Sequence, residues 1–333
     1  MPSTVVVGGF FGDEGKGKII SYLAKKDNPT IVVRGGAGPN AGHTIKDGNT
    51  TYKVRMLPSG FLNKNARVMI GPGVVVDPQV FLKEIQEFGV SSRAFMDNHC
   101  GIIEQNHIDQ DSKGRLKDKI GSTGSGTGPA NAERAMRTLK MAKDIESLSS
   151  YIKDVPDEIN SALKNKEEVL VEGTQGTHLS LWHGTYPFVT SKDVTAAGIC
   201  ADVGLGPKNV NEVLVVFKAY LTRVGTGPMS GELGAEETEK KGWAEFGTVT
   251  GRPRRAAEFD FNLARRAVML NSATQIAITK LDVRFPECSG VKSMDELSSD
   301  AKSFIKNIEE KLEVPVTLIG TGPLVDDVVD LRA

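Results

Sequence analysis

A glycine-rich loop that carries one acid pair and two lysines is the first part of this sequence that could do chemistry. Residues 12–18 read Gly-Asp-Glu-Gly-Lys-Gly-Lys and fit the G-x-x-x-x-G-K spacing of a phosphate-binding loop. Free backbone N–H groups and the positive end of a following helix dipole favour an anion at such a turn. Ile19 stands where these loops usually carry the Ser or Thr that holds magnesium. We therefore expect Asp13 to bind the metal, to act as an acid–base group, or to do both.

A second motif has the form of a guanine-recognition sequence. Thr279-Lys280-Leu281-Asp282 resembles the Asn/Thr-Lys-x-Asp signature of guanine-nucleotide proteins. Guanine presents two donors, N1–H and the 2-amino group, to one carboxylate, whereas adenine cannot supply that pair. The lysine stem would cover the face of the base. The alternative is a salt bridge at a strand end, but a phosphate loop in the same chain favours a guanine site.

Three further clusters place polar groups among glycines. In residues 40–44, Asn-Ala-Gly-His-Thr, a backbone carbonyl could reach a metal while the imidazole reaches a phosphoryl oxygen, although an isolated histidine can also be structural. Residues 121–128 offer hydroxyls and N–H groups for a second phosphate, with Arg137 beyond them, or form only a flexible loop. Residues 248–255 hold three arginines within four positions, and arginine forks match carboxylates and phosphates. A solvated basic loop or a nucleic-acid patch remains the other interpretation of this last cluster.

The elements that must position these groups are predicted by apolar runs. Seven runs rich in β-branched residues predict strands covered on both faces, as in a parallel sheet, at residues 4–7, 30–33, 68–70, 169–171, 213–217, 275–279 and 316–319. Helical patterns lie at residues 19–24, 77–88, 132–143, 259–270 and 300–312. The polar stretch 106–119 predicts an excursion or mobile loop, and 144–166 an amphipathic helical insertion. We expect an α/β fold of the P-loop NTPase kind, with a mostly parallel central sheet flanked by helices. We expect one domain over residues 1–333, with helical and loop excursions near 106–166.

The positions of the polar clusters predict a single site. Residues 34–44 follow the second predicted strand, and Glu172-Gly173-Thr174-Gln175-Gly176 follow the fourth. Residues 280–282 and 320–323 follow the sixth and seventh. Open α/β sheets bind their ligands at the carboxyl ends of the strands.

Composition excludes several classes of protein. The chain has 333 residues, of which 39% are hydrophobic and 25% charged, with a net charge of −1, so wholesale nucleic-acid binding is disfavoured. Cys100, Cys200 and Cys288 are odd in number and far apart, so they predict no disulfide framework. The sequence shows no signal peptide and no long apolar run. We expect a cytoplasmic enzyme that binds neither nucleic acid nor membrane.

The order of these motifs, over nearly the whole chain, resembles that of the adenylosuccinate synthetase family in its compact archaeal-type form. The matching segments are residues 12–18, 40–44, 121–128, 171–176, 184–191, 222–228, 247–254, 279–282 and 321–323. The resemblance implies a magnesium-dependent ligase of AMP biosynthesis that joins IMP to L-aspartate. GTP would be converted to GDP and phosphate, through a 6-phosphoryl-IMP intermediate. The resemblance also implies a homodimer, in which Arg137 reaches the IMP phosphate of the neighbouring subunit.

The resemblance implies a role for individual residues. Asp13 would take the proton from N1 of hypoxanthine, His43 would donate to the transferring phosphoryl group, and Asp13 with the Gly42 carbonyl would bind Mg²⁺. Contacts with GTP are implied for Gly12, Asp13, Glu14, Gly15, Lys16, Gly17, Lys18, Gly42, His43, Thr44, Arg254, Lys280, Leu281, Asp282, Gly320, Thr321 and Gly322. Contacts with IMP are implied for Asp13, Lys16, Asn40, Ala41, Gly42, His43, Thr123, Arg137, Gln175, Thr190 and Arg252. Contacts with L-aspartate are implied for Thr248, Val249, Thr250, Gly251, Arg252 and Arg254.

The sequence departs from the family pattern in places. Phe10-Phe11 and Glu258 stand where the family commonly has tryptophan, and Ala37-Gly38-Pro39 replaces the usual turn. Each departure could alter the fit of the purine.

Other functions are less well supported. A phage-type relative that uses deoxyguanylate lacks an acid at the position of Asp13, so the acid here favours IMP. A regulatory GTPase would carry Asp-x-x-Gly at a strand end, yet residues 111–114, which match it, lie in the polar excursion. A nucleic-acid-binding P-loop protein is disfavoured by the charge balance.

Overall fold

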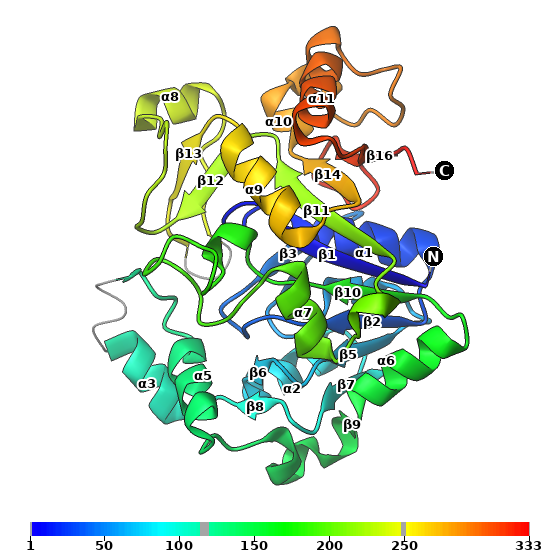
Figure 1. Cartoon of the computed structure of the whole chain (residues 1–333), viewed down its shortest axis with the longest axis vertical. Coiled ribbons are helices and arrows are strands. Elements are labelled where there is room, and N and C mark those ends of the chain that lie inside the picture. Colours follow the sequence, from blue (N-terminus) through cyan, green and yellow to red (C-terminus); the bar gives the residue numbers. More distant parts are fainter. Residues whose placement is uncertain (1, 114–119, 248–250, 333) are drawn as a thin grey trace.

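A large, mostly parallel sheet forms the centre of the molecule (Figure 1). The computed structural model describes residues 2–113, 120–247 and 251–332. Within those ranges ten strands lie in the order β16-β15-β14-β11-β1-β10-β2-β5-β7-β9, and neighbours are parallel except for β15 and β16. The strands are β1 (Ser3–Gly8), β2 (Ile31–Arg34), β5 (Arg67–Ile70), β7 (Ala94–Asp97), β9 (Ile152–Lys153), β10 (Val169–Glu172), β11 (Glu212–Lys218), β14 (Gln275–Thr279), β15 (Val316–Gly320) and β16 (Val328–Asp330). The predicted fold class is confirmed, and each of the seven predicted strands is present with its ends displaced by at most one residue.

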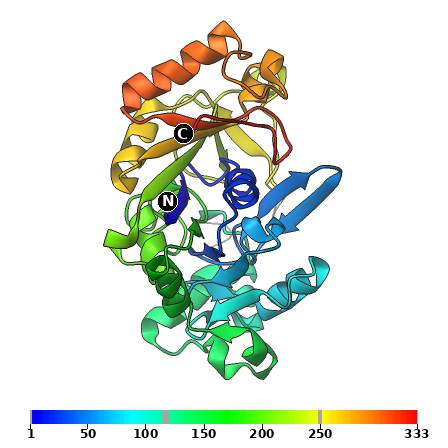
Figure 2. The same cartoon turned by 90° about the vertical axis from the view of Figure 1, so that its right-hand side faces the viewer.

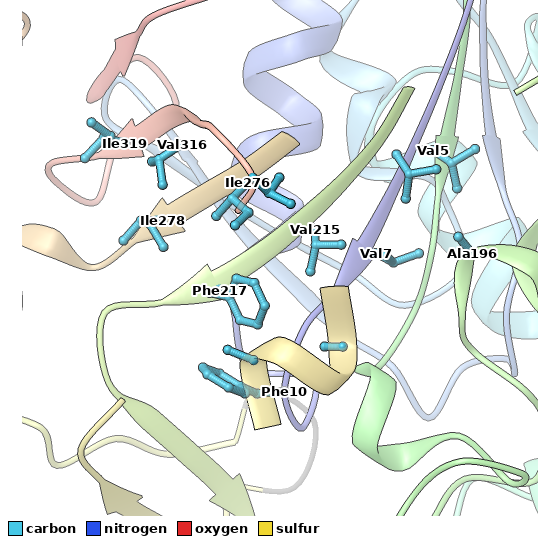
Figure 3. Close-up of a cluster of buried hydrophobic side chains, with 14 of the residues drawn as sticks. Val5, Val7, Phe10, Ala196, Val215, Phe217, Ile276, Ile278, Val316 and Ile319 are labelled. Carbon is cyan, nitrogen blue, oxygen red and sulfur yellow. The ribbon is translucent and has the colours of Figure 1, made fainter. Parts of the chain in front are cut away.

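The sheet is covered on both faces because successive side chains of a strand point to opposite sides. Val6 packs with the apolar side of α1 (Lys16–Asp27) on one face. Val5 and Val7 belong to the larger cluster on the other face, which includes residues of α6 (Val155–Lys164), α7 (Ala196–Val203), α9 (Phe261–Asn271) and α11 (Ser299–Leu312). Figure 3 shows members of this larger cluster, with Phe10 beside Phe217. The two layers fix β1 and the loop that follows it in the middle of the sheet.

Several helices differ from their predicted positions. The pattern at 259–270 becomes α9, capped by the side chain of Asp260, and that at 300–312 becomes α11, capped by Ser298. The helix predicted at 132–143 is wrong: α5 (Thr127–Met136) begins inside the glycine-rich segment and ends before Arg137. Gly126 at its start and Arg137 at its end both have positive φ, 75° and 67°, which breaks the helical path at each side.

The predicted excursions are more ordered than expected. The polar stretch from residue 106 forms α3 (Gln105–Lys113), which packs against α5, while 114–119 lie outside the described residues. Within 144–166 a 3₁₀ turn (Glu146–Tyr151) and β9 precede α6. Asp154 caps α6 and Pro156 lies in its first turn, which fixes the helix start. The remaining helices are α2 (Pro78–Glu87), α8 (Ala235–Lys240) and α10 (Leu281–Arg284).

Two antiparallel strand pairs outside the main sheet differ from the predicted elements. One is β3 (His43–Asp47) with β4 (Thr50–Val54), which projects from the body of the molecule (Figure 2). The other is β12 (Leu221–Val224) with β13 (Arg254–Ala257). They place His43 and Arg254 at the starts of β3 and β13. A short parallel pair, β6 (Val75–Val76) and β8 (Gly101–Ile102), also lies outside the main sheet. Over the described ranges no helix combines the length and the apolar character needed to cross a membrane.

Candidate active site

In the loop after β1, the side chain of Glu14 accepts hydrogen bonds from the loop's own backbone. Gly12 and Gly15 have φ values of 97° and 80°, a conformation that favours glycine. One carboxylate oxygen of Glu14 accepts the backbone N–H groups of Phe10 (2.9 Å) and Gly12 (2.8 Å). The other lies 2.9 Å from Lys16 Nζ, and both of these side chains are 1% exposed. Lys16 also donates to the Gln175 carbonyl, so its ammonium group is engaged by protein atoms.

The second lysine of the loop joins two parts of the predicted nucleotide site. Lys18 Nζ donates to the carbonyl oxygens of Gly322 (2.5 Å) and Asp327 (2.7 Å), in the segment after β15. Burial lowers the pKa of Lys18 to about 8, although Asp327 and Asp282 oppose the shift. The side chain therefore ties the start of α1 to the loop that contains the predicted Gly320-Thr321-Gly322 contact.

Asp13 meets the arginine cluster that the sequence places more than two hundred residues away. Its Oδ2 lies 3.2 Å from Arg254 Nε and accepts the hydroxyl of Thr222 at 3.4 Å. Burial raises the pKa of Asp13, against the attraction of Arg254 and of Lys218. The loop after β1, the end of β11 and the hairpin β12–β13 therefore converge on this carboxylate.

His43 lies beside the same loop and has a buried carboxylate behind it. A Cβ on Gly17 would lie 2.7 Å from Cβ of His43, so glycine permits their close approach. His43 Nδ1 lies 2.7 Å from both Glu172 Oε1 and Ser59 Oγ, and Glu172 Oε2 accepts the Ser59 N–H at 2.6 Å. A carboxylate at this distance requires the proton on Nδ1, which leaves Nε2 for a ligand.

The protonation of this pair follows from its burial. Burial lowers the pKa of His43, although Glu172 opposes the shift. Burial alone would raise the pKa of Glu172, but His43 and then Arg34 more than compensate and the net shift is downward. A neutral imidazole therefore faces an ionised Glu172.

Several predicted contact residues carry polar atoms that lack a partner. In the part of the chain that the structure describes, Asn40 Oδ1, Gln175 Nε2 and Asp282 Oδ1 are buried without a hydrogen-bond partner. Leaving such an atom unsatisfied costs about 1–3 kcal/mol, so groups of this kind mark the space of a ligand. Asn40 also donates to the hydroxyl of Thr190 at 3.3 Å, which brings two predicted IMP contacts together.

The guanine-type motif is connected to the phosphate loop. Thr279 at the end of β14 donates its hydroxyl to the Glu14 carbonyl at 2.6 Å. Lys280 has a φ of 58° and is half exposed, Leu281 is fully buried, and burial raises the pKa of Asp282 against the opposing Lys280 and Lys18. A base at this motif would therefore lie next to phosphates at the loop after β1.

The two remaining glycine-rich clusters contact each other. Arg252 donates to the Gly121 carbonyl at 2.9 Å, and the Thr123 hydroxyl bonds to that of Ser125 at 2.7 Å. Gly251 donates its N–H to the Gly247 carbonyl at 2.8 Å, next to the three arginines of residues 248–255, which we call the arginine loop. Thr248, Val249 and Thr250 lie outside the described residues.

Other predicted contacts lie at the edge of the site. Ala41 accepts from Arg34 through its carbonyl at 3.4 Å, and Gly42 is half-buried next to His43. Thr44 is exposed on β3, and Arg137 is exposed at the end of α5.

The departures from the family pattern lie behind the site or on the surface. Phe10 packs edge-on against Phe217 (4.8 Å) and Phe259 (5.2 Å), and Phe11 lies under the Arg223 guanidinium at 4.3 Å. Both phenylalanines therefore support the phosphate loop from beneath. Glu258 is half exposed and pairs with Arg284 at 2.8 Å and with Lys241 at 3.0 Å.

Sequence reasoning missed three side chains that organise the site, namely Glu172, Lys218 and Glu245. Glu172 behind His43 stands in a motif that was noticed but given no individual role. Lys218 is buried and Glu245 is largely buried beside Arg254, and only Lys218 has a sequence signal, since it follows the predicted strand 213–217. Asp111, the acid of the Asp-x-x-Gly match, lies in α3 and accepts the Ser122 hydroxyl (2.5 Å) and the Gly126 N–H (2.9 Å). It holds the 121–128 segment and does not occupy a strand end.

Comparisons with known proteins agree with this geometry. The sequence model of the adenylosuccinate synthetase family matches residues 5–146 and 139–287. The adenylosuccinate synthetase of Methanococcus vannielii is 54% identical over 336 residues, which cover 100% of this chain and 99% of the relative. The structure of fully ligated adenylosuccinate synthetase from Plasmodium falciparum matches with a TM-score of 0.91 and 27% identity over 99% of each chain. Succinoaminodeoxyadenylate synthetase of cyanophage S-2L, bound to dGMP and to dATP as an energy donor, matches with a TM-score of 0.82 and 26% identity over 100% of this chain and 96% of that one. The chain belongs to the adenylosuccinate synthetase family.

Proposed function

We propose that this protein joins IMP and L-aspartate to form adenylosuccinate, with GTP converted to GDP and phosphate. The observation that carries the proposal is the meeting of Asp13, His43 and Arg254, from three distant segments, at one phosphate-type loop. The loop lies beside an Asp282 whose free oxygen suits guanine. A carboxylate base, an imidazole and an arginine fork are the groups that such a coupled phosphoryl transfer and amination require.

The chemistry divides between these side chains. Asp13 removes the proton from N1 of hypoxanthine, and the resulting 6-oxyanion attacks the γ-phosphorus of GTP. In its imidazolium form His43 donates from Nε2 to the transferring phosphoryl group, while Glu172 accepts the Nδ1–H at 2.7 Å. The amine of L-aspartate then attacks C6 and displaces phosphate. Phosphate is a far better leaving group than oxide.

Mg²⁺ fits the residues present. The Asp13 carboxylate and the Gly42 carbonyl are oxygen donors of the kind that this cation prefers, and burial raises the pKa of Asp13 although Arg254 and Lys218 oppose the shift. When bound, the cation would offset the charge that develops on the phosphate oxygens. Arg254 supplies part of that neutralisation at Asp13.

The buried polar atoms that lack a hydrogen-bond partner indicate which residues would contact the substrates. Asn40 and Gln175 would bind IMP together with Thr190, and Asp282 would accept both guanine donors. Arg252 and Arg254 would clamp the L-aspartate carboxylates. Lys16 uses two of its three N–H donors on Glu14 and the Gln175 carbonyl, so the third is left for a phosphate.

The quaternary structure and the compartment are further parts of the proposal. Arg137 is exposed beside Met136, which is 67% exposed, so both side chains are available to a second subunit. We propose a homodimer in which Arg137 completes the partner's IMP phosphate site. The free thiols of Cys100, Cys200 and Cys288 are typical of a reducing compartment and support the cytoplasm.

Turnover separates this function from its rivals. Purified protein with IMP, GTP, Mg²⁺ and L-aspartate should release phosphate and form adenylosuccinate, measured by its ultraviolet absorbance. Replacing IMP by dGMP tests the phage-type activity, which the acid at Asp13 disfavours. Absence of aspartate-dependent phosphate release would reject the ligase, whereas release that ignores both IMP and L-aspartate would indicate a GTPase.

A further inference from the structure

We infer that Glu245 is a positioning residue of the L-aspartate site, and that it acts by holding Arg254. The inference deepens the proposed function and rests on it. Glu245 lies in the segment that leads into the arginine loop, and its side chain is 14% exposed. Nothing in the motifs of the sequence singles it out.

Arg254 and Glu245 are joined by one hydrogen bond between backbone groups and one between side chains. The Arg254 backbone N–H donates to the Glu245 carbonyl at 2.9 Å, and Arg254 Nη1 donates to Glu245 Oε2. The other end of the guanidinium faces Asp13, at 3.2 Å from Nε. Arg254 is therefore held between two carboxylates that have different tasks.

Only one of these carboxylates is free to remain in place during the reaction. Asp13 must turn toward the purine and the cation, and then it no longer orients Arg254. Glu245 has no such task, because its oxygens face protein donors. The guanidinium keeps one fixed hydrogen bond while its remaining N–H groups receive the substrate carboxylate.

The surroundings of Glu245 make it a rigid anchor. Its Oε2 accepts from Lys218 Nζ at 2.9 Å, and its Oε1 accepts the Tyr220 hydroxyl at 2.5 Å. Lys280 Nζ lies 4.0 Å away. Burial opposes ionisation, but Lys218 and Arg254 dominate and lower the pKa of Glu245 to about 2. The Tyr220 ring stacks on Trp243, with 4.4 Å between centroids and 9° between planes, so the segment before Glu245 is fixed as well.

The first test is the variant Glu245→Gln, which keeps the size of the side chain and removes its charge. We expect the KM for L-aspartate to rise by at least about tenfold, while the KM for IMP stays within about twofold. Glu258→Gln is the matched control, because Glu258 also pairs with an arginine and a lysine but lies on the surface. The control should leave both constants unchanged.

A double-mutant cycle separates positioning from general support of the fold. Arg254→Leu alone should raise the same KM, and adding Glu245→Gln should then have no further effect. Equal multiplicative effects in both backgrounds would overturn the inference. If Glu245→Gln does not fold, Tyr220→Phe, which removes one donor to the carboxylate, should raise the KM for L-aspartate by a smaller factor, and an unchanged value would overturn it.

The outcomes distinguish this inference from the proposed function. An active wild type whose KM for L-aspartate is the same in Glu245→Gln overturns only the role of Glu245. A wild type without aspartate-dependent turnover overturns both.

Discussion

Replacing Glu172 by glutamine should disable His43 without removing it. Glu172 is fully buried, and its Oε1 lies 2.7 Å from His43 Nδ1. Glutamine keeps the shape and one acceptor but not the charge. Because Nδ1 already carries its proton, Nε2 can donate to a phosphoryl group only when the ring is an imidazolium. The carboxylate of Glu172 is the nearest group that stabilises that form.

The size of the effect follows from the geometry. Two unit charges 2.7 Å apart attract each other by roughly 6 kcal/mol at an effective dielectric constant of about 20. This attraction opposes the loss of the imidazolium through burial, and general acid catalysis contributes about 10²–10⁴ in rate. We therefore expect Glu172→Gln to lower kcat by about 10² or more, with the KM values for IMP and L-aspartate within about threefold.

The pH dependence gives an independent readout. The donor is lost as pH rises through the pKa of His43, which Glu172 raises and burial lowers. Without Glu172 this pKa falls, so the alkaline limb of kcat should move to lower pH. The assay is phosphate release at saturating substrates across the pH range, with His43→Asn as the reference for complete loss and thermal unfolding as the control for folding. A variant with wild-type kcat and an unmoved alkaline limb would refute the reasoning.

Three further variants test the remaining roles. Asp13→Ala should abolish IMP-dependent phosphate release because the base is gone, and near-normal turnover would show that Asp13 is not that base. Arg254→Leu should mainly raise the KM for L-aspartate, by about 10–150-fold if one charged hydrogen bond of about 1.5–3 kcal/mol is lost; steady-state kinetics with varied L-aspartate measures this, and a change confined to kcat would contradict a binding role. Asp282→Asn should raise the KM for GTP by a similar factor. XTP should become the better substrate, because its 2-oxo group accepts a hydrogen bond from the new amide. An unchanged preference for GTP over XTP would place the base elsewhere.

The strands and the location of the site could be predicted because they depend on local properties. Continuous β-branched runs report burial on both faces, and the glycine-rich segments follow strand ends whatever the strand order. The helix at residue 127 could not be placed, because its start depends on the positive φ of Gly126 and not on apolar periodicity. The pairs His43–Glu172 and Arg254–Glu245 form only when the strand order and the hairpins bring separate segments together. Motif spacing contains no information about such partners.

The carboxylate of Glu14 gives the phosphate loop an occupant of its own. It holds two of the amides and the ammonium group that an incoming anion would use. Nucleotide binding is therefore an exchange of one anion for another, and its net free energy is smaller than the contacts with the triphosphate alone would give. A small anion that offers no more than a carboxylate gains little from this exchange. We therefore expect the loop to bind inorganic phosphate and sulfate weakly, and to release Glu14 for a ligand that brings additional contacts from the base, the ribose or the second substrate.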